Sequence, residues 1–117
     1  MANNVREPKD YTNGTIDNIV QYFNMEYCDV FDLNEKQYKR SDFYCGITGD
    51  IDANLARHNV KGYTACVLCD SFETASNVER KLGELGFEIG DTDRLGNGGN
   101  EKSRIVYMIE QTEGFIR

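Results

Sequence analysis

The sequence predicts an α+β domain in which helices flank a small antiparallel β-sheet of three central strands, with room for an additional C-terminal hairpin. Two segments with apolar residues at helical spacing follow Thr15 and Ser71, which are residue types that cap helices. Short segments rich in aromatic and β-branched residues lie around these helices, as is typical of strands. A chain of 117 residues is long enough to bury one core.

An N-terminal helix is expected after a loose segment. Residues 1–13 are polar and contain the only proline of the chain, and chain ends of this kind are often poorly ordered. We therefore expect a single domain over residues 14–117. Its first helix begins after Thr15, whose side chain can cap it. The following apolar residues have the spacing of one helical face: Ile16, Ile19, Val20 and Phe23.

Strands and helices are expected to alternate in the central part of the chain. Residues 27–33 alternate enough in polarity to predict a strand, and the charged residues 34–41 connect it to a second strand over residues 42–48. Asp50 can cap a short helix that ends near His58.

The last part of the chain is expected to contain a buried strand, a helix and a hairpin. The apolar residues 62–70 predict the strand. Ser71 can cap the next helix, and Gly86 lies where a left-handed residue commonly ends one. Two further short strands are expected over residues 87–89 and 104–109.

Two short motifs are compatible with ligand sites, but we expect both to be structural. Cys66 and Cys69 have the spacing of half a zinc site, yet residues three apart in a strand point to opposite faces of the sheet. Residues 96–100 are rich in glycine but lack the lysine of a phosphate-binding P-loop, so we expect a hairpin loop. All the cysteines are expected to be reduced: Cys28, Cys45, Cys66 and Cys69.

Charge and hydropathy restrict the classes of function. The net charge is −7 and the basic residues do not cluster, which disfavours nucleic acid as a partner. No stretch approaches the roughly 20 apolar residues that span a bilayer. The first residues also lack the basic and apolar pattern of a secretory signal. We therefore expect a cytoplasmic protein without a membrane partner.

The most specific motif runs from Tyr44 to His58. It contains Tyr-Cys-Gly in a predicted strand, then Thr48, a helix start at Asp50, and Leu55 followed by the histidine. This pattern resembles the second half of the signature of the GIY-YIG endonucleases. The expected order of strand, strand, helix, strand and helix is also the order that this fold implies.

The resemblance implies a nuclease site with two departures. Tyr44 and His58 match residues of the family, and Glu79 matches the glutamate that holds its divalent metal. Phe31 stands where the family has a tyrosine, and Asn54 stands where it has the catalytic arginine. Loss of one charge-stabilising donor typically costs a factor of about 10²–10³ in rate. We therefore expect no efficient catalysis and no cofactor, with Mg²⁺ at Glu79 only if the chain is a nuclease.

These observations favour a non-catalytic, GIY-YIG-like binding domain. The expected binding residues in the former active-site cleft are Tyr44, Asn54, Arg57, His58 and Glu79. Six acidic residues are expected at its rim, where they would attract a protein with a basic surface: Asp29, Asp32, Glu35, Asp42, Asp50 and Asp52. A small acidic domain of this kind also suits an inhibitor of DNA-handling enzymes that a phage or other mobile genetic element encodes.

Other interpretations remain open at this level. In a metal-dependent DNA endonuclease, Arg57 or Arg40 would replace the missing arginine. A small-molecule or structural role is a further alternative. The matched residues also have structural explanations, because Tyr44 can be a strand tyrosine, His58 a packed histidine and Glu79 a partner in an ion pair.

Overall fold

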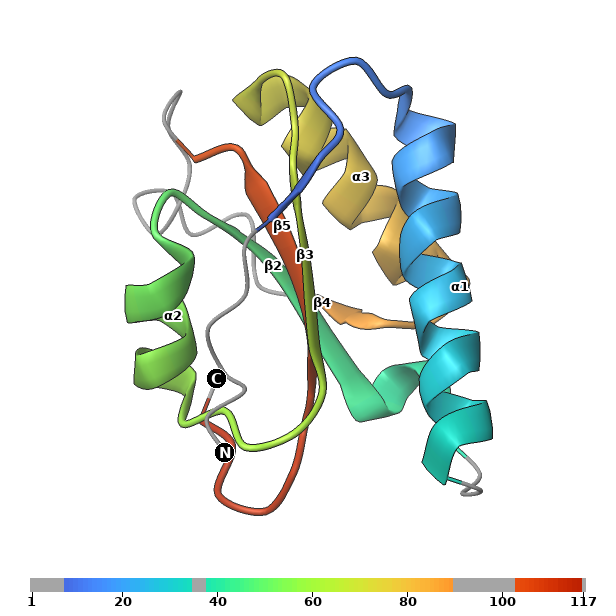
Figure 1. Ribbon diagram of the computed structural model, residues 1–117, viewed down its shortest axis with the longest axis vertical. Coiled ribbons are helices and arrows are strands. Elements are labelled where there is room, and N and C mark those ends of the chain that lie inside the picture. Colours follow the sequence, from blue (N-terminus) through green and yellow to red (C-terminus); the bar gives the residue numbers. More distant parts are fainter. Residues whose placement is uncertain (1–7, 35–37, 90–102, 117) are drawn as a thin grey trace.

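The computed structural model describes residues 8–34, 38–89 and 103–116, and for residues 31–34 it describes the backbone. A five-stranded sheet forms the centre, with α2 on one face and α1 and α3 on the other (Figure 1). The predicted α+β class is therefore confirmed. The elements are β1 (Lys9–Asp10), α1 (Ile16–Asn34), the 3₁₀ turn η1 (Arg40–Asp42), β2 (Phe43–Thr48), α2 (Ile51–His58), β3 (Thr64–Leu68), α3 (Phe72–Leu85), β4 (Glu88–Ile89) and β5 (Ile105–Glu110).

The sheet is mixed, in the order β1-β3-β5-β2-β4. Its three central strands are antiparallel neighbours, because β5 lies between β3 and β2 and runs opposite to both. The two outer strands, β1 and β4, pair in parallel with β3 and β2. As a result, every strand except β5 runs in the same direction.

The strand predicted over residues 27–33 is wrong, because these residues form the second half of α1. Val30 continues the apolar face that Ile19 and Phe23 begin, and all three side chains are buried. Tyr27 packs edge-on against the ring of Phe43. The polarity pattern of residues 27–33 fits one face of a helix as well as it fits a strand, so a segment this short does not distinguish the two. The central place in the sheet is taken by β5.

The ends of the chain also differ from the prediction. β4 and β5 do not form a hairpin, because they pair with opposite sides of β2. Part of the segment expected to be loose is ordered: β1 pairs with β3, and the N–H of Tyr11 donates to the carbonyl of Leu68. The predicted loop over residues 96–100 lies outside the described residues.

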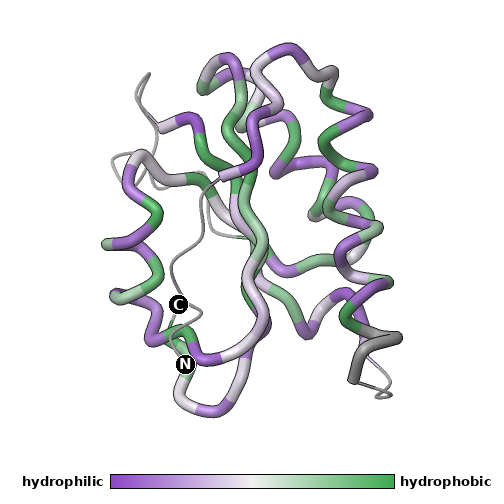
Figure 2. Tube along the Cα trace, viewed as in Figure 1, coloured by the Kyte–Doolittle hydropathy of each residue, from purple (hydrophilic) through white to green (hydrophobic). Residues whose placement is uncertain are grey.

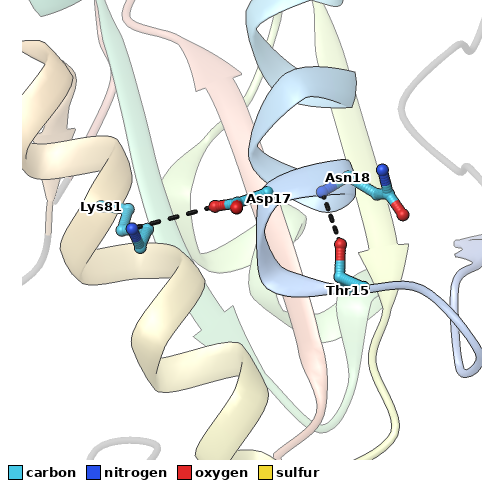
Figure 3. Close-up of polar contacts among 4 residues, drawn as sticks. All are labelled: Thr15, Asp17, Asn18 and Lys81. Atoms are coloured by element: carbon cyan, nitrogen blue, oxygen red, sulfur yellow. Dashed lines mark hydrogen bonds and ion pairs between the residues drawn. The ribbon is translucent and has the colours of Figure 1, made fainter.

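Helix ends follow the predicted caps. The backbone N–H of Asn18 donates to Oγ1 of Thr15 at 3.1 Å (Figure 3). Asp50 and Ser71 accept the corresponding bonds at the starts of α2 and α3. Gly86 ends α3 with a left-handed φ of 114°.

Two apolar layers fill the space between the helices and the sheet. Hydrophobic and hydrophilic residues alternate along the helices, as expected for elements that bury one face (Figure 2). The layer under α1 and α3 is the larger and contains Phe23, Phe43, Val78, Leu82 and Met108. The layer under α2 contains Tyr44, Leu55, Cys66, Tyr107 and Ile109.

An exposed ion pair also connects α1 with α3. Nζ of Lys81 lies 3.9 Å from Oδ1 of Asp17 (Figure 3). Pairs in such exposed positions contribute little to stability, so the packing of the two helices depends on their apolar faces.

Within the described parts of the chain, no helix has both the length and the apolar character needed to cross a membrane.

Candidate functional site

The layer under α2 contains a buried cluster of polar and aromatic side chains. β2 contributes Tyr44, β5 contributes Tyr107, and α2 contributes Asn54 and His58. All four are buried. We call these four residues the tyrosine–histidine cluster.

Gly46 makes room for this cluster. It faces Tyr107 across β2 and β5, and a Cβ atom at position 46 would lie 2.4 Å from the phenol oxygen. Only a residue without a side chain lets the tyrosine ring lie across the backbone of β2. The glycine of the Tyr-Cys-Gly motif therefore positions the phenol under α2.

Hydrogen bonds join the cluster to the C-terminal segment. Nδ1 of His58 lies 2.5 Å from the carbonyl oxygen of Ile116. Since a carbonyl only accepts, Nδ1 carries the proton, and Nε2 accepts the O–H of Tyr107 at 3.1 Å. The side chain of Asn54 also hydrogen-bonds the phenol. Its Oδ1 atom is buried without a hydrogen-bond partner among the described residues.

Phe115 covers the cluster from the C-terminal side. Its ring stacks on the imidazole of His58 with a centroid distance of 5.3 Å and an interplanar angle of 9°. It also contacts the ring of Tyr44, at a centroid distance of 5.6 Å. Phe115 therefore occupies the position from which a ligand would contact the imidazole of His58.

Burial favours the neutral forms of His58 and Tyr107 in the cluster. It lowers the pKa of His58, as does the nearby charge of Arg57, although the hydrogen bond to Ile116 raises that pKa. Burial, followed by the neighbouring Tyr44, raises the pKa of Tyr107 well above its ordinary value. A phenol with a raised pKa is a poor group to deprotonate water at neutral pH.

The predicted site residues are only partly brought together. Tyr44, Asn54 and His58 lie in the cluster, whereas Arg57 is exposed on the outer side of α2. Glu79 comes from α3, on the other face of the sheet, and is 2% exposed. Its charge raises the pKa of the Cys45 thiol as well as that of the Tyr107 phenol.

Phe31 does not occupy the place that the resemblance gives to a strand tyrosine. Its backbone belongs to α1, across the sheet from Tyr44. The tyrosine on a neighbouring antiparallel strand is Tyr107, which was not among the predicted site residues. Ile105, Tyr107 and Ile109 occupy every second position of a strand that was predicted. Because such residues point to the same face of a sheet, this spacing was the sequence feature that could have placed Tyr107 on the face under α2.

Three of the cysteines, Cys45, Cys66 and Cys69, are buried as expected for core residues, whereas Cys28 is exposed on α1. Cys66 is buried under α2, and Cys69 is buried on the opposite face of the sheet. Burial raises the pKa of the Cys69 thiol to about 11. No three His, Cys, Asp or Glu side chains in the described parts of the chain are grouped so that they could hold a metal ion.

The predicted acidic rim does not form as one group. Asp29 lies on α1, across the sheet from α2, and the carboxylate of Asp42 accepts the backbone N–H of Lys39 at 2.8 Å. Only Asp50 and Asp52 lie beside α2, at its start. The other two predicted members, Asp32 and Glu35, are not among the side chains that the structure describes.

A different set of acids gathers at one end of the sheet. β1, β2 and β3 run in the same direction, so the residues at their carboxyl ends share one end of the sheet, at the top of Figure 1. α2 and α3 begin at this end. We call the exposed carboxylates here the acidic end: Asp10, Asp50, Asp52, Asp70 and Glu73.

Local hydrogen bonds keep two of these carboxylates charged. Backbone and side-chain bonds from Thr12 lower the pKa of Asp10. Bonds from Thr74 and Ser71 lower the pKa of Asp70, and the charge of Arg104 lowers it further. The lowered pKa values favour the charged form of Asp10 and Asp70, and Arg104 is a basic group near Asp70.

Comparisons with known proteins found no similarity: no protein-family model matches this chain, and neither do the curated proteins or the solved structures.

His58 is expected to make stability dependent on pH. Its pKa in the folded state lies below the ordinary value of 6.5, so the unfolded chain binds the proton more readily between these two values. The free energy of unfolding should therefore fall as the pH drops below about 6.5, by at most about 1.4 kcal/mol per pH unit. Urea denaturation from pH 7.5 to 5.5 measures this slope.

The variant His58→Gln is the control, because it removes the only histidine of the chain. It should lose the slope above pH 5.5, whatever its own stability is. An equal slope in both proteins would contradict the assignment.

Proposed function

We propose that this chain is a non-catalytic, GIY-YIG-like domain that binds a protein partner with a basic surface. The acidic end is the observation that carries the proposal: five exposed carboxylates lie at the end of the sheet where β1, β2 and β3 end and α2 and α3 begin. We place this interaction in the cytoplasm, in keeping with four cysteines that form no disulfide with one another.

The tyrosine–histidine cluster argues against catalysis. Asn54, at the arginine position of the resemblance, is 5% exposed and carries no charge for a phosphate. The hydroxyl of Tyr107 and the imidazole of His58 are already bonded to each other, and Phe115 covers them. The histidine that matches the nuclease pattern is therefore engaged by Tyr107 and by the C-terminal segment, and we assign it no catalytic role.

The endonuclease alternative requires a cation and a metal ligand at Tyr44. Arg57 is exposed on α2, and Glu79 projects from the far side of the sheet. Their charges reach the phenol of Tyr107, where they act on its pKa in opposite directions. A phenol that stays protonated gives this alternative no base, so we favour the binding domain.

Charge also indicates the class of partner. Exposed carboxylates repel nucleic acid and attract basic protein surfaces, which raises the rate of association at low salt. Enzymes that handle DNA present such surfaces to phosphates. We therefore propose a DNA-binding surface as the target, in the manner of an inhibitor that a mobile genetic element encodes.

Neutralising the acidic end tests this proposal. The triple variant Asp52→Asn, Asp70→Asn and Glu73→Gln removes three charges and leaves the helix cap Asp50 in place. Proteins captured from an extract of the native cell should bind it at least about tenfold more weakly than the unmodified chain. Capture should also weaken with added salt and with added double-stranded DNA, because salt screens exposed charges and DNA competes for the basic surface.

A second triple variant controls for net charge. Asp29→Asn, Glu84→Gln and Glu113→Gln also removes three exposed carboxylates, all away from the acidic end. It should capture the same proteins as the unmodified chain. If both triple variants capture partners equally well, the acidic end is not the binding surface.

A further inference from the structure

The C-terminal segment binds the rest of the domain as a short peptide ligand would. Residues 111–116 follow β5 and turn back onto the end of α2. Three consecutive residues contact the end of α2: Gly114 and Ile116 through backbone hydrogen bonds, and Phe115 through its ring. This place lies at the opposite end of α2 from the acidic end.

Backbone groups at both sides of the phenylalanine are bound. The N–H of Ile116 donates to the carbonyl of His58 at 2.9 Å, and Nδ1 of His58 donates to the carbonyl of Ile116. Nδ2 of Asn59 donates to the carbonyl of Gly114 at 3.0 Å. These three bonds recognise main-chain atoms, so they fix the peptide's position without selecting its side chains.

Specificity for a peptide sequence comes from two positions, those of Phe115 and Gly114, because the surrounding residues restrict which side chain fits there. The ring of Phe115 stacks on His58 and contacts Tyr44, so this position requires an aromatic ring. Gly114 has a φ of 89°, and a Cβ atom there would lie 3.2 Å from Nδ2 of Asn59, so this position requires glycine. Ile116 is 56% exposed, so its side chain is free to vary.

We infer that the pocket formed by Tyr44, His58 and Asn59 is a recognition site for a Gly-aromatic-X peptide, which the chain's own C-terminal segment fills and can exchange for a peptide in trans. The ligand class is a short segment that forms a turn at its glycine, as the chain does where the N–H of Phe115 donates to the carbonyl of Thr112. An aromatic residue follows the glycine, and any residue whose backbone N–H and C=O groups can bond follows the aromatic one. The chain's own segment has the advantage of being tethered, so it competes at a high effective concentration.

A peptide with the sequence Gln-Thr-Glu-Gly-Phe-Ile and blocked ends tests the site. The full-length variant Phe115→Ala weakens the competing segment, and should bind this peptide at least about tenfold more tightly than the unmodified chain does. His58 is the only histidine, so its imidazole signals in NMR spectra report binding at the pocket directly. These signals should shift on addition of the peptide.

Three altered peptides test the selection. Replacement of phenylalanine or of glycine by alanine should weaken binding to the Phe115→Ala protein by at least about tenfold. Replacement of isoleucine by alanine should leave it within about twofold, because that side chain is exposed. Absence of binding at millimolar peptide, or equal binding of the phenylalanine and alanine peptides, would overturn the inference.

Hydrogen exchange in the unmodified chain gives an independent test that does not depend on any variant. The amide of Ile116 should exchange through local opening, at least about a hundredfold faster than the amide of Met108 in the centre of β5. Equal protection of the two amides would mean that the segment leaves only when the whole domain unfolds, and the inference would fail.

Discussion

Replacing Asn54 with arginine is expected to destabilise the domain by about 3 to 5 kcal/mol, because the new charge would be buried without a partner. The side chain of Asn54 is 5% exposed and lies against the phenol of Tyr107. No carboxylate belongs to the tyrosine–histidine cluster that could pair with a guanidinium. Urea denaturation measures the loss, and an assay with plasmid DNA and Mg²⁺ or Mn²⁺ should show no cleavage before or after the change.

Ala53→Arg is the matched control, since it adds the same side chain one position earlier on α2. Ala53 is exposed, so the arginine can stay in water. We expect its free energy of unfolding to stay within about 0.5 kcal/mol of the unmodified chain. A stable Asn54→Arg protein that cuts DNA would show that the cluster is a nuclease site lacking one residue.

Gly46→Ala is expected to cost about 3 kcal/mol, near the upper end for an overpacked core. The new Cβ would lie 2.4 Å from the phenol oxygen of Tyr107 and 2.6 Å from the adjoining ring carbon. The ring has little room to move away, because His58 and Asn54 bind its hydroxyl. Thermal or urea denaturation measures the cost.

A double variant shows whether this contact is the cause. With Tyr107→Ala already present, Gly46→Ala should cost no further stability, because the ring that it would strike is absent. Gly83→Ala is a contrast on α3, where the nearest atom is the flexible end of Ile89 and alanine favours the helix. It should change stability by less than about 1 kcal/mol. Equal losses at positions 46 and 83 would contradict the assigned role of Tyr107.

The local features of this fold could be predicted from the sequence. Thr15, Asp50 and Ser71 cap helices by bonding to residues three positions later, and Gly86 ends α3 in a left-handed conformation. Each of these depends on a few consecutive residues. The strand through Tyr44 was predicted for the same reason, because its aromatic residues and flanking turn are local.

The failed predictions concern choices that the local sequence leaves undecided. Residues 27–33 fit a strand by alternation and a helix by the continued face of Ile19 and Phe23, and packing against Phe43 and Leu82 favours the helix. The last residues of the chain gave no sign that β5 would take the central place in the sheet. Pairing between distant strands depends on long-range contacts, which a short window does not contain.

The sequence by itself therefore determined the α+β class, the caps and the presence of Tyr44 and His58 in one motif. Only the tertiary structure decided what these residues do. Tyr107 meets His58 across 49 residues and Ile116 meets it across 58, and their bonds make the histidine a packed, neutral group. The same is true of the acidic end, whose carboxylates are scattered in the sequence and lie at one end of the sheet because β1, β2 and β3 run in the same direction. Residue type is a property of the chain, whereas burial, hydrogen-bond partners and local field depend on which distant segments the fold brings together.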